Sequence, residues 1–383
     1  MGNPAKPRLV VLDDHITPYR VPIFTRLQHE DVDLRVLYCS ARLPDRQWEI
    51  PKGLPYPHEI LPNLQIRLRR APFGERRVIL VNPTLGWRLL RLEPDVVVGY
   101  AYSVPTWTAF AFARLFGKRF ISWSTDTLHT ERHIGHWQSL IRRVIIPRAD
   151  ACVTPSAAGL ARFVRWGAKA DRVRIAPQGP DVGALQETLR ESRQQDSGGG
   201  SPEGPVILYV GSLSERKGVL LLLDSFRDVH AQIPDARLHL VGEGRLRGEL
   251  MRRIEALGLG DAVRLVGFVP HADLATWYAR ATVFVLPTLE DTYAVVLAEA
   301  AACGLPLVTT PFAGAAAEVV REGFNGVVAD PRDPKEFARK ILAVLSDKEE
   351  LSRMSRNSIE MARGLGPEVA ARRIVEATKL ALG

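Results

Sequence analysis

The sequence predicts an α/β protein built from two doubly wound parallel sheets, and three observations support this. Short apolar runs recur through the 383-residue chain between segments with helical patterning. These runs are apolar on both faces, as strands are when helices cover both sides of a parallel sheet. Finally, Glu191 to Pro205 lacks large apolar residues and contains three successive glycines, which is typical of a flexible linker.

The expected strands fall into two series that the glycine-containing segment separates. The first series comprises residues 8–12, 34–38, 95–99, 119–123, 151–154 and 173–176. The second comprises residues 206–210, 237–241, 263–269, 283–286, 305–309 and 326–329. The segments between them are long enough for the helices that connect parallel strands. Beyond Asp330 the pattern is wholly helical, with Pro334 and Pro367 at positions that favour helix starts.

These elements predict the domain organisation. We expect an N-terminal Rossmann-like domain over residues 1–190, a flexible linker or loop over 191–205 and a C-terminal Rossmann-like domain over 206–365. The last helix, over 366–383, is expected to pack back toward the N-terminal domain. Ligands of open α/β sheets bind beyond the carboxyl ends of the strands, so two facing domains would enclose a cleft.

Composition narrows the class of protein. Hydrophobic residues make up 46% and charged residues 25%, as in ordinary folded soluble proteins. The three cysteines lie far apart and form neither a redox pair nor a zinc motif, so we expect a reducing cytoplasm and no metal. The first residues lack the pattern of a signal peptide. Residues 1–200 carry a net charge of +10 and the rest −2, so the basic excess belongs to the first half.

A phosphate-binding segment is predicted directly after the strand at 206–210. Gly211 ends that strand, and the following residues lead through Arg216, Lys217 and Gly218 into an apolar helix. Two adjacent cations at a helix start oppose the helix dipole unless an anion lies opposite, and a diphosphate would explain both. The alternative is a pair of solvated surface cations. The spacing is not that of a Walker P-loop.

A second segment whose residues could bind a ligand follows the strand at 283–286. A helix begins near Ala294, and the first amides of this helix, around Val295 and Val296, can donate to a phosphate. Glu299 is a lone carboxylate on this otherwise apolar helix. It is either a buried charge or a group that points into the cleft and accepts hydrogen bonds from hydroxyls, which is the interpretation we favour.

The motifs GSLSERKG and PTLEDTYAVVLAEAAACGLPLVTT resemble the donor domain of family 4 glycosyltransferases, which have the GT-B fold. The similarity extends to residues 264–270 and, in the N-terminal half, to 15–24, 46–48 and 176–181. The N-terminal residues are similar to members that assemble bacterial surface polysaccharides or exopolysaccharides. The resemblance implies a retaining hexosyltransferase that takes a UDP- or GDP-linked sugar and needs neither a catalytic metal nor a cofactor.

The resemblance also implies roles for individual residues. Arg216 and Lys217 would neutralise the donor diphosphate, Glu299 would hold the ribose hydroxyls, and Asp291 is the fourth catalytic candidate. The expected donor-binding residues, among them the backbone contacts to the nucleobase and the residues around the sugar, are Gly211, Ser212, Phe268, Val269, Glu290, Thr292, Tyr293, Ala294, Val295 and Val296. Two positions depart from the family, since Asp291 replaces a usual glutamate and Ser212 a frequent arginine.

The N-terminal half offers candidates for the acceptor side. Tyr19 and Arg20 follow the first strand, where family members often have glycines. Asp126 and His129 lie in the loop after the strand at 119–123, and either could orient the acceptor hydroxyl. The alternative is that Asp126 or Thr127 caps a helix and that His129 is merely exposed.

Three functions other than glycosyl transfer are alternatives for this sequence. A retaining hydrolase would need two carboxyl groups about 5 Å apart across the scissile bond and would leave the two cations unexplained. A nucleotide-sugar 2-epimerase of similar fold is the alternative enzyme. A non-catalytic basic binding protein is a further alternative, but the basic half has neither interleaved aromatic residues nor a helix-turn-helix pattern, so we expect no nucleic-acid partner.

Residues 65–80 combine arginines with large apolar side chains, a composition that suits an anionic bilayer. We therefore expect a cytoplasmic enzyme that is peripheral on the inner face of the cell membrane and elongates a glycan or lipid-linked acceptor. The alternative is an arginine-rich loop beside a soluble acceptor. The arginines expected to meet the membrane are Arg67, Arg69, Arg70, Arg76 and Arg77.

Overall fold

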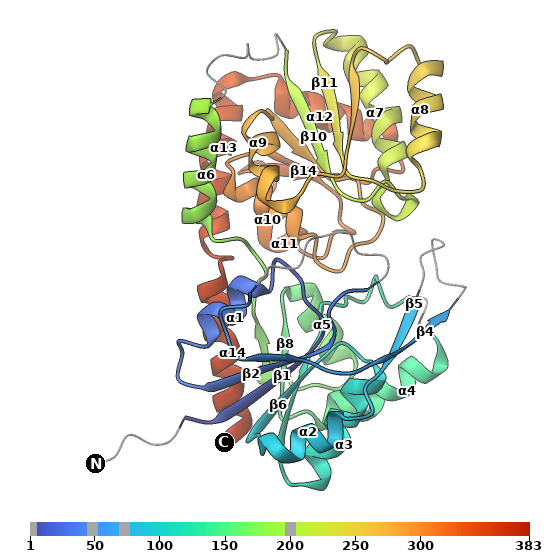
Figure 1. Ribbon diagram of the computed structural model, residues 1–383. Coiled ribbons are helices and arrows are strands. Elements are labelled where there is room, and N and C mark those ends of the chain that lie inside the picture. Colours follow the sequence, from blue (N-terminus) through green and yellow to red (C-terminus); the bar gives the residue numbers. More distant parts are fainter. Residues whose placement is uncertain (1–5, 44–52, 69–76, 133, 196–203) are drawn as a thin grey trace. The chain divides into compact units, whose positions relative to one another are not determined.

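The computed structural model describes residues 6–43, 53–68, 77–132, 134–195 and 204–383 (Figure 1). The chain forms two compact units, one made of Met1–Gln178 with Pro367–Gly383 and the other of Gly179–Gly366. Each unit contains a parallel sheet with helices on both faces, so the predicted fold class is confirmed.

The N-terminal unit is built on a seven-stranded parallel sheet with the order β3-β2-β1-β6-β7-β8-β9. Its strands are largely apolar and buried, apart from the short edge strand β3, which carries polar residues. They are β1 (Arg8–His15), β2 (Asp33–Ser40), β3 (His58–Ile60), β6 (Val96–Tyr100), β7 (Arg119–Trp123), β8 (Ala151–Thr154) and β9 (Val173–Ile175). A separate antiparallel hairpin pairs β4 (Leu64–Leu68) with β5 (Arg77–Val81).

Helices cover the two faces of this sheet with separate apolar clusters. On one face lie α1 (Val21–Leu27) and the last helix, α14 (Pro367–Leu382). On the other lie α2 (Leu85–Leu92), α3 (Val104–Leu115), α4 (His136–Ile145) with the 3-10 turn η2 (Ile146–Arg148), and α5 (Ala157–Arg165), followed by the turn η3 (Ala170–Arg172). The last helix thus packs within the N-terminal unit.

The C-terminal unit has a six-stranded parallel sheet with the order β12-β11-β10-β13-β14-β15, which is the 3-2-1-4-5-6 order of dinucleotide-binding folds. Its strands are β10 (Val206–Val210), β11 (Arg237–Val241), β12 (Val263–Gly267), β13 (Val283–Val285), β14 (Leu307–Thr309) and β15 (Gly326–Val328). Its helices and 3-10 turns are α6 (Val182–Gln195), η4 (Glu215–Lys217), α7 (Val219–Gln232), α8 (Arg247–Ala256), η5 (His271–Asp273), α9 (Leu274–Ala279), α10 (Val295–Ala302), α11 (Ala316–Val319), α12 (Pro334–Leu345) and α13 (Lys348–Arg363).

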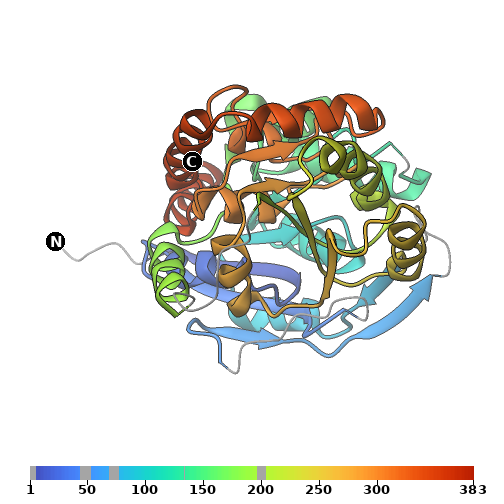
Figure 2. The same cartoon turned by 90° about the horizontal axis from the view of Figure 1, so that it is seen from above.

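The helices of the C-terminal unit form two packed groups. One group contains α7, α8 and α12, and the other contains α6, α9, α10, α11 and α13. Figure 2 shows helices on both sides of this sheet. The core between them includes the apolar side chains of β10 and the buried face of α7, such as Leu222 and Phe226.

The division between the units differs in position from the expected linker. It lies between Gln178 and Gly179, because α6 packs on the helices and core of the C-terminal unit. Residues 191–195 of the expected linker are the last residues of that helix, and residues 196–203 lie outside the described residues.

Candidate functional site

Two loops at the carboxyl edge of the C-terminal sheet carry the predicted chemistry. One follows β10 and leads through η4 into α7, and the other follows β13 and leads into α10. They meet at Gly218, whose φ of 65° is left-handed, and a β-carbon there would lie 2.0 Å from the Pro287 carbonyl oxygen. Glycine is therefore required at the start of α7, because any side chain would push the two loops apart.

Arg216 joins the two loops. Its carbonyl oxygen accepts hydrogen bonds from the Leu289 amide at 2.9 Å and from the Thr288 hydroxyl at 3.1 Å. Its guanidinium Nη1 donates to the Glu290 carbonyl oxygen at 3.0 Å. The position of one positive charge is thus set by the backbone of the neighbouring loop.

Lys217 forms an ion pair with Asp291, and both side chains are largely buried. The Asp291 Oδ1 atom also accepts from the amides of Tyr293 at 3.3 Å and Ala294 at 3.1 Å. Burial alone raises the pKa of the Asp291 carboxyl, but the charges of Lys217 and Arg216 outweigh burial and lower it below its ordinary value. Asp291 is therefore ionised at neutral pH and holds the lysine ammonium at the edge of the sheet.

The turn from Asp291 to Ala294 is held in an unusual conformation. Ala294, which caps α10, has a φ of 69° in the left-handed region that residues other than glycine rarely adopt. The backbone of residues 312–315 fastens this turn, because Gly314 donates to the Asp291 carbonyl at 3.0 Å and Ala315 to that of Tyr293 at 2.8 Å. A strained turn that is held by its surroundings is typical of a functional site.

Glu299 lies on α10 and is buried, and each carboxylate oxygen has a partner. Oε1 accepts from His271 Nε2 at 3.0 Å, and Oε2 accepts from the Tyr278 hydroxyl at 3.0 Å. The hydrogen bond to Glu299 raises the pKa of His271, and burial raises that of Tyr278 well above its ordinary value. The His271 side chain is 55% exposed, so it can move away from the carboxylate without breaking the core.

The other residues predicted to bind the donor lie in the loops after β10, β12 and β13 and at the start of α10. Phe268 is exposed and Val269 is half-buried just before His271, at the end of β12. Ser212 and Ser214 lie with their hydroxyl oxygens 3.2 Å apart in the loop after Gly211. Val295 and Val296 begin α10 and are half-buried, whereas Tyr293 is buried. Glu290 and Thr292 lie on either side of Asp291 in the loop before this helix. Two residues that contact Glu299, His271 and Tyr278, were not predicted from the sequence. The position of His271 directly after Pro270 was the signal available for it.

In the N-terminal unit, Arg20 is part of the core. It is 1% exposed, pairs with Asp13 at 3.0 Å and donates from Nε to the Thr17 hydroxyl at 2.9 Å. Its guanidinium also stacks 4.1 Å from the ring centre of Tyr100 and 5.6 Å from that of Tyr19. The Arg20 side chain is thus held by its partners in the core. Tyr19 is half-buried.

Asp126 and His129 lie in the loop after β7. The Asp126 Oδ2 atom accepts from the Ser124 hydroxyl at 3.1 Å and from Arg142 Nη2 at 3.3 Å. His129 is half-buried, and its Nε2 atom accepts from Arg132 Nη2 at 2.9 Å. Of the two predicted caps, Asp126 does not act as one, since its side chain faces Ser124 and Arg142. The Thr127 hydroxyl accepts from the Thr130 amide at 3.3 Å and so caps a turn at this position.

A buried carboxylate anchors the same loop, and sequence reasoning missed it. Glu131 Oε1 accepts from Arg142 Nε and from Arg162 Nη2, both at 2.5 Å, and Oε2 accepts from Trp166 Nε1 at 2.7 Å. The pKa of Glu131 is lowered, because the two arginines outweigh the burial that would raise it. Arg142 therefore links the buried anchor to Asp126.

Two of the five predicted membrane-facing arginines lie within the described residues. Arg67 is exposed on β4, and Arg77 begins β5. Arg69, Arg70 and Arg76 lie outside the described residues, as does the segment 46–48. Among the described residues, no helix is long and apolar enough to cross a membrane. The described residues also contain no group of three or more His, Cys, Asp or Glu that could hold a metal ion.

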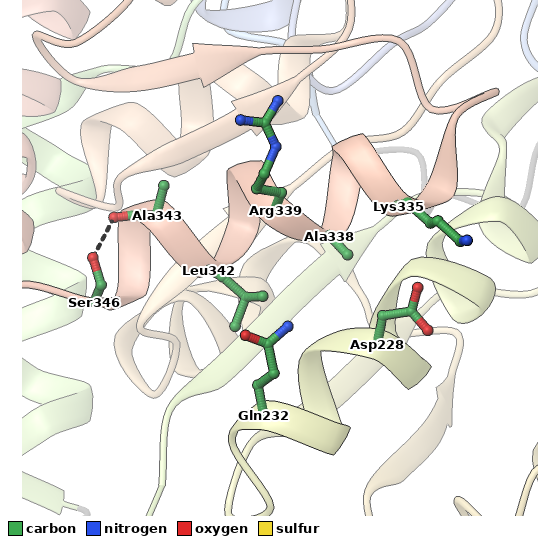
Figure 3. Close-up of a pocket in the computed structure, with 8 residues that line it drawn as sticks. All are labelled: Asp228, Gln232, Lys335, Ala338, Arg339, Leu342, Ala343 and Ser346. Atoms are coloured by element: carbon green, nitrogen blue, oxygen red, sulfur yellow. Dashed lines mark hydrogen bonds between the residues drawn. The ribbon is translucent and has the colours of Figure 1, made fainter.

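A separate depression lies between α7 and α12 (Figure 3). Asp228 and Gln232 come from the last turns of α7, at the opposite end of that helix from Gly218. Ala338 and Leu342 point toward α7 from α12, whereas the guanidinium of Arg339 points away from Asp228 and Gln232. The hydrogen bond drawn there joins Ser346 to the Ala343 carbonyl. This depression lies between two helices and contains none of the residues described above, and we assign it no role.

A known protein family and several known proteins have sequences similar to this chain. Residues 191–361 match the family model described as glycosyl transferases group 1. The chain is 29% identical to D-inositol 3-phosphate glycosyltransferase 1 of Catenulispora acidiphila, over 62% of this chain and 59% of that protein. It is 26% identical to a sulfoquinovosyl transferase of Arabidopsis thaliana, over 71% of this chain and 54% of that protein. The match thus spans little more than half the length of these relatives.

The fold as a whole resembles solved structures over almost the entire chain. Alr3699/HepE of Anabaena, solved in complex with UDP, superposes with a TM-score of 0.76 at 19% identity. The superposition covers 97% of this chain and 99% of that one. This similarity establishes the two-domain GT-B architecture.

Proposed function

We propose that this protein is a retaining glycosyltransferase that moves a sugar from a nucleotide diphosphosugar to an acceptor hydroxyl. The match of residues 191–361 to the family model of glycosyl transferases group 1 supports this proposal. The observation that carries the proposal is the pairing of Lys217 with Asp291 and the support of Arg216 by the loop after β13. These contacts place two cations beside the first turn of α10, where a departing diphosphate can be stabilised.

The donor would exchange partners with groups that now bind each other. A diphosphate would take the ammonium of Lys217 from Asp291, and the released carboxylate would face the sugar. The amides at the start of α10 would donate to phosphate oxygens. Ribose hydroxyls would take the place of His271 on Glu299, and the backbone of Phe268 and Val269 would meet the nucleobase.

The chemistry of the step follows from these positions. The bond between the anomeric carbon and the diphosphate oxygen breaks, and a bond to the acceptor oxygen forms on the same face of the sugar. The acceptor proton leaves with the diphosphate product. The enzyme stabilises the charge that develops on the leaving group, which is where the two cations lie. We propose that these cations act without a metal or cofactor, so that turnover continues in excess EDTA.

Glu299→Gln tests the ribose assignment. A carboxylate that accepts from both ribose hydroxyls binds them more strongly than a neutral amide, so we expect nucleoside diphosphate affinity to fall by about tenfold, or ~1.4 kcal/mol. Titration calorimetry with UDP and GDP measures this change, and Glu336→Gln on α12 is the matched control. An unaltered affinity together with a raised melting temperature would show that Glu299 is only a buried charge, and would reject the assignment.

The pH dependence of nucleotide binding tests the exchange at Glu299. Protonated His271 binds Glu299 more tightly than neutral His271, and its hydrogen bond to that carboxylate raises the His271 pKa. Nucleoside diphosphate affinity should therefore weaken as the pH falls through this raised pKa. His271→Ala should remove that part of the pH dependence and strengthen binding at the acid end. A wild-type affinity that does not vary between pH 8 and pH 6, about the range in which histidine titrates, would contradict the exchange.

We place the acceptor on the N-terminal unit, where Asp126 can accept a hydrogen bond from a hydroxyl and His129 lies in the same loop. The acceptor class that fits the basic, partly apolar hairpin at Arg67 is a glycan carried on a lipid. The enzyme would then work in the cytoplasm, on the inner face of the cell membrane. Incubation with a panel of labelled nucleotide sugars tests the function. Transfer of label to a lipid-extractable glycan is expected, whereas epimerisation of the nucleotide sugar alone would replace transfer by the 2-epimerase alternative.

A further inference from the structure

Three neighbouring helices of the N-terminal unit expose large apolar side chains to solvent. Helix α3 packs against α2 and against α4, and all three lie on the same side of the seven-stranded sheet (Figure 1). We call their outer surface the α2–α4 face. Its exposed apolar residues are Trp87 and Leu90 on α2, Trp107 and Leu115 on α3, and Trp137 and Leu140 on α4.

The spacing of these residues places those of each helix on its outer side. On α3, exposed Val104, Trp107, Ala111 and Leu115 recur every three or four residues, which is one line along a helix. The opposite side of α3 is buried in the core. Trp137 and Leu115 are each 79% exposed, so these side chains contribute little to the packing of the unit. Several large apolar residues exposed together on a soluble surface indicate an interaction site.

The charge around this face is positive. Residues 85–150, which include the three helices, contain nine arginines and lysines against five acidic residues. Two of these cations, Arg114 and Arg119, pair with Asp150. Glu131 is buried between two arginines and adds nothing to the surface. Arg143 lies one turn beyond Leu140 and is exposed, as is Arg148 after the helix. The α2–α4 face therefore presents tryptophan and leucine together with exposed arginines such as Arg143 and Arg148.

We propose that the α2–α4 face is the surface by which this protein lies on an anionic lipid bilayer. Tryptophan side chains favour the interface between headgroups and acyl chains, and the arginines beside them favour anionic lipids. A second copy of this chain could cover the apolar side chains but would not require an excess of cations. An anionic bilayer accounts for both features and therefore fits this face better. This proposal rests on the proposed function in one respect, which is the reason for the contact: on the bilayer the enzyme would reach an acceptor carried on a lipid.

The contact differs from the hairpin at Arg67, because the α2–α4 face supplies apolar insertion as well as charge. The experiment therefore compares variants of the two surfaces. Wild-type protein is sedimented with vesicles of phosphatidylcholine alone and of phosphatidylcholine with phosphatidylglycerol, across a salt series. The variants are Trp137→Ser with Leu140→Ser, Arg143→Glu alone, and Arg67→Glu on the hairpin. Met251→Ser is the control, because Met251 is a 55% exposed apolar residue of the C-terminal unit.

We expect wild-type protein to bind the anionic vesicles and to bind more weakly as salt increases. The double variant should bind at least about tenfold more weakly, because it loses two inserted apolar side chains. Arg143→Glu should bind at least about fivefold more weakly at low salt, and this difference should shrink at high salt. Met251→Ser should bind like the wild type. UDP and GDP binding should be the same in all five proteins, so a loss there would concern the proposed function and not this surface.

Three results would overturn the proposal. The first is an absence of binding to anionic vesicles at low salt. The second is wild-type binding by both variants of the α2–α4 face together with a loss of binding in Arg67→Glu, which would assign the membrane contact to the hairpin. The third is a wild-type dimer in light scattering that Trp137→Ser with Leu140→Ser converts to a monomer, which would assign the face to a second copy of the chain.

Discussion

Replacing Lys217 by alanine should lower the rate of sugar transfer about 30- to 1000-fold, or ~2 to 4 kcal/mol, because the variant loses a cation that stabilises the departing diphosphate. The same substitution leaves Asp291 buried without its partner. Its pKa should then rise, since the attraction to Lys217 that now lowers it is gone. The variant should therefore also melt at a lower temperature than the wild type.

Controls separate the two effects of Lys217→Ala. Lys348→Ala removes an exposed lysine of the same unit and should change neither rate nor stability. Lys217→Arg keeps the charge and should recover part of the activity and most of the melting temperature. Turnover by a folded Lys217→Ala protein at the wild-type rate would eliminate the diphosphate role, whatever the change in melting temperature.

Glu131→Gln should destabilise the protein by about 3 to 5 kcal/mol, the largest stability effect we expect from a single substitution. The reason is that it leaves Arg142 and Arg162 buried without their shared carboxylate. Chemical denaturation followed by circular dichroism measures the change. Glu93→Gln is the matched control, because Glu93 pairs with Arg8 at the surface and such pairs contribute about 0 to 1 kcal/mol. A loss of the same size in both variants would contradict the role of the buried cluster.

The sign of the pH effect at Glu131 follows from the direction of its shift. Its pKa in the folded protein is lower than the ordinary value of 4.5, so the folded state binds the proton less readily than the unfolded state. The stability that the ionised carboxylate contributes is therefore present above about pH 4.5 and is lost as the pH falls through the lowered pKa. Wild-type protein should lose stability over this acid range, and Glu131→Gln should lose less.

Much of the fold was predictable, because strands buried on both faces of a parallel sheet are apolar throughout. Each expected apolar run is a strand of the structure, and the expected helix starts at Pro334 and Pro367 are correct. Three strands were not predicted. Strand β3 consists of three residues at the sheet edge, His-Glu-Ile, and β4 alternates apolar residues with Gln65 and Arg67, so neither has a continuous apolar pattern. Strand β5 has four successive apolar residues, but it pairs with β4 in an antiparallel hairpin outside the parallel sheet.

The candidate site was predictable in its residues but not in its pairings. The motifs placed Lys217, Asp291 and Glu299 at the carboxyl edge, where the structure has them. The contacts between Lys217 and Asp291, 74 positions apart, and between His271 and Glu299, 28 apart, arise because the sheet brings distant loops together. Spacing along a single sequence does not contain that information. The catalytic and binding roles of these residues stay predictions.

The central claim is that a nucleoside diphosphate binds at the carboxyl edge of the C-terminal sheet through Lys217 and Glu299. Titration calorimetry of the wild type, Lys217→Ala and Glu299→Gln with UDP and with GDP tests it most directly. We predict that one of the two nucleotides binds the wild type at a single site and binds each variant more weakly. Failure of both nucleotides to bind the wild type, or equal affinity in all three proteins, would contradict the claim.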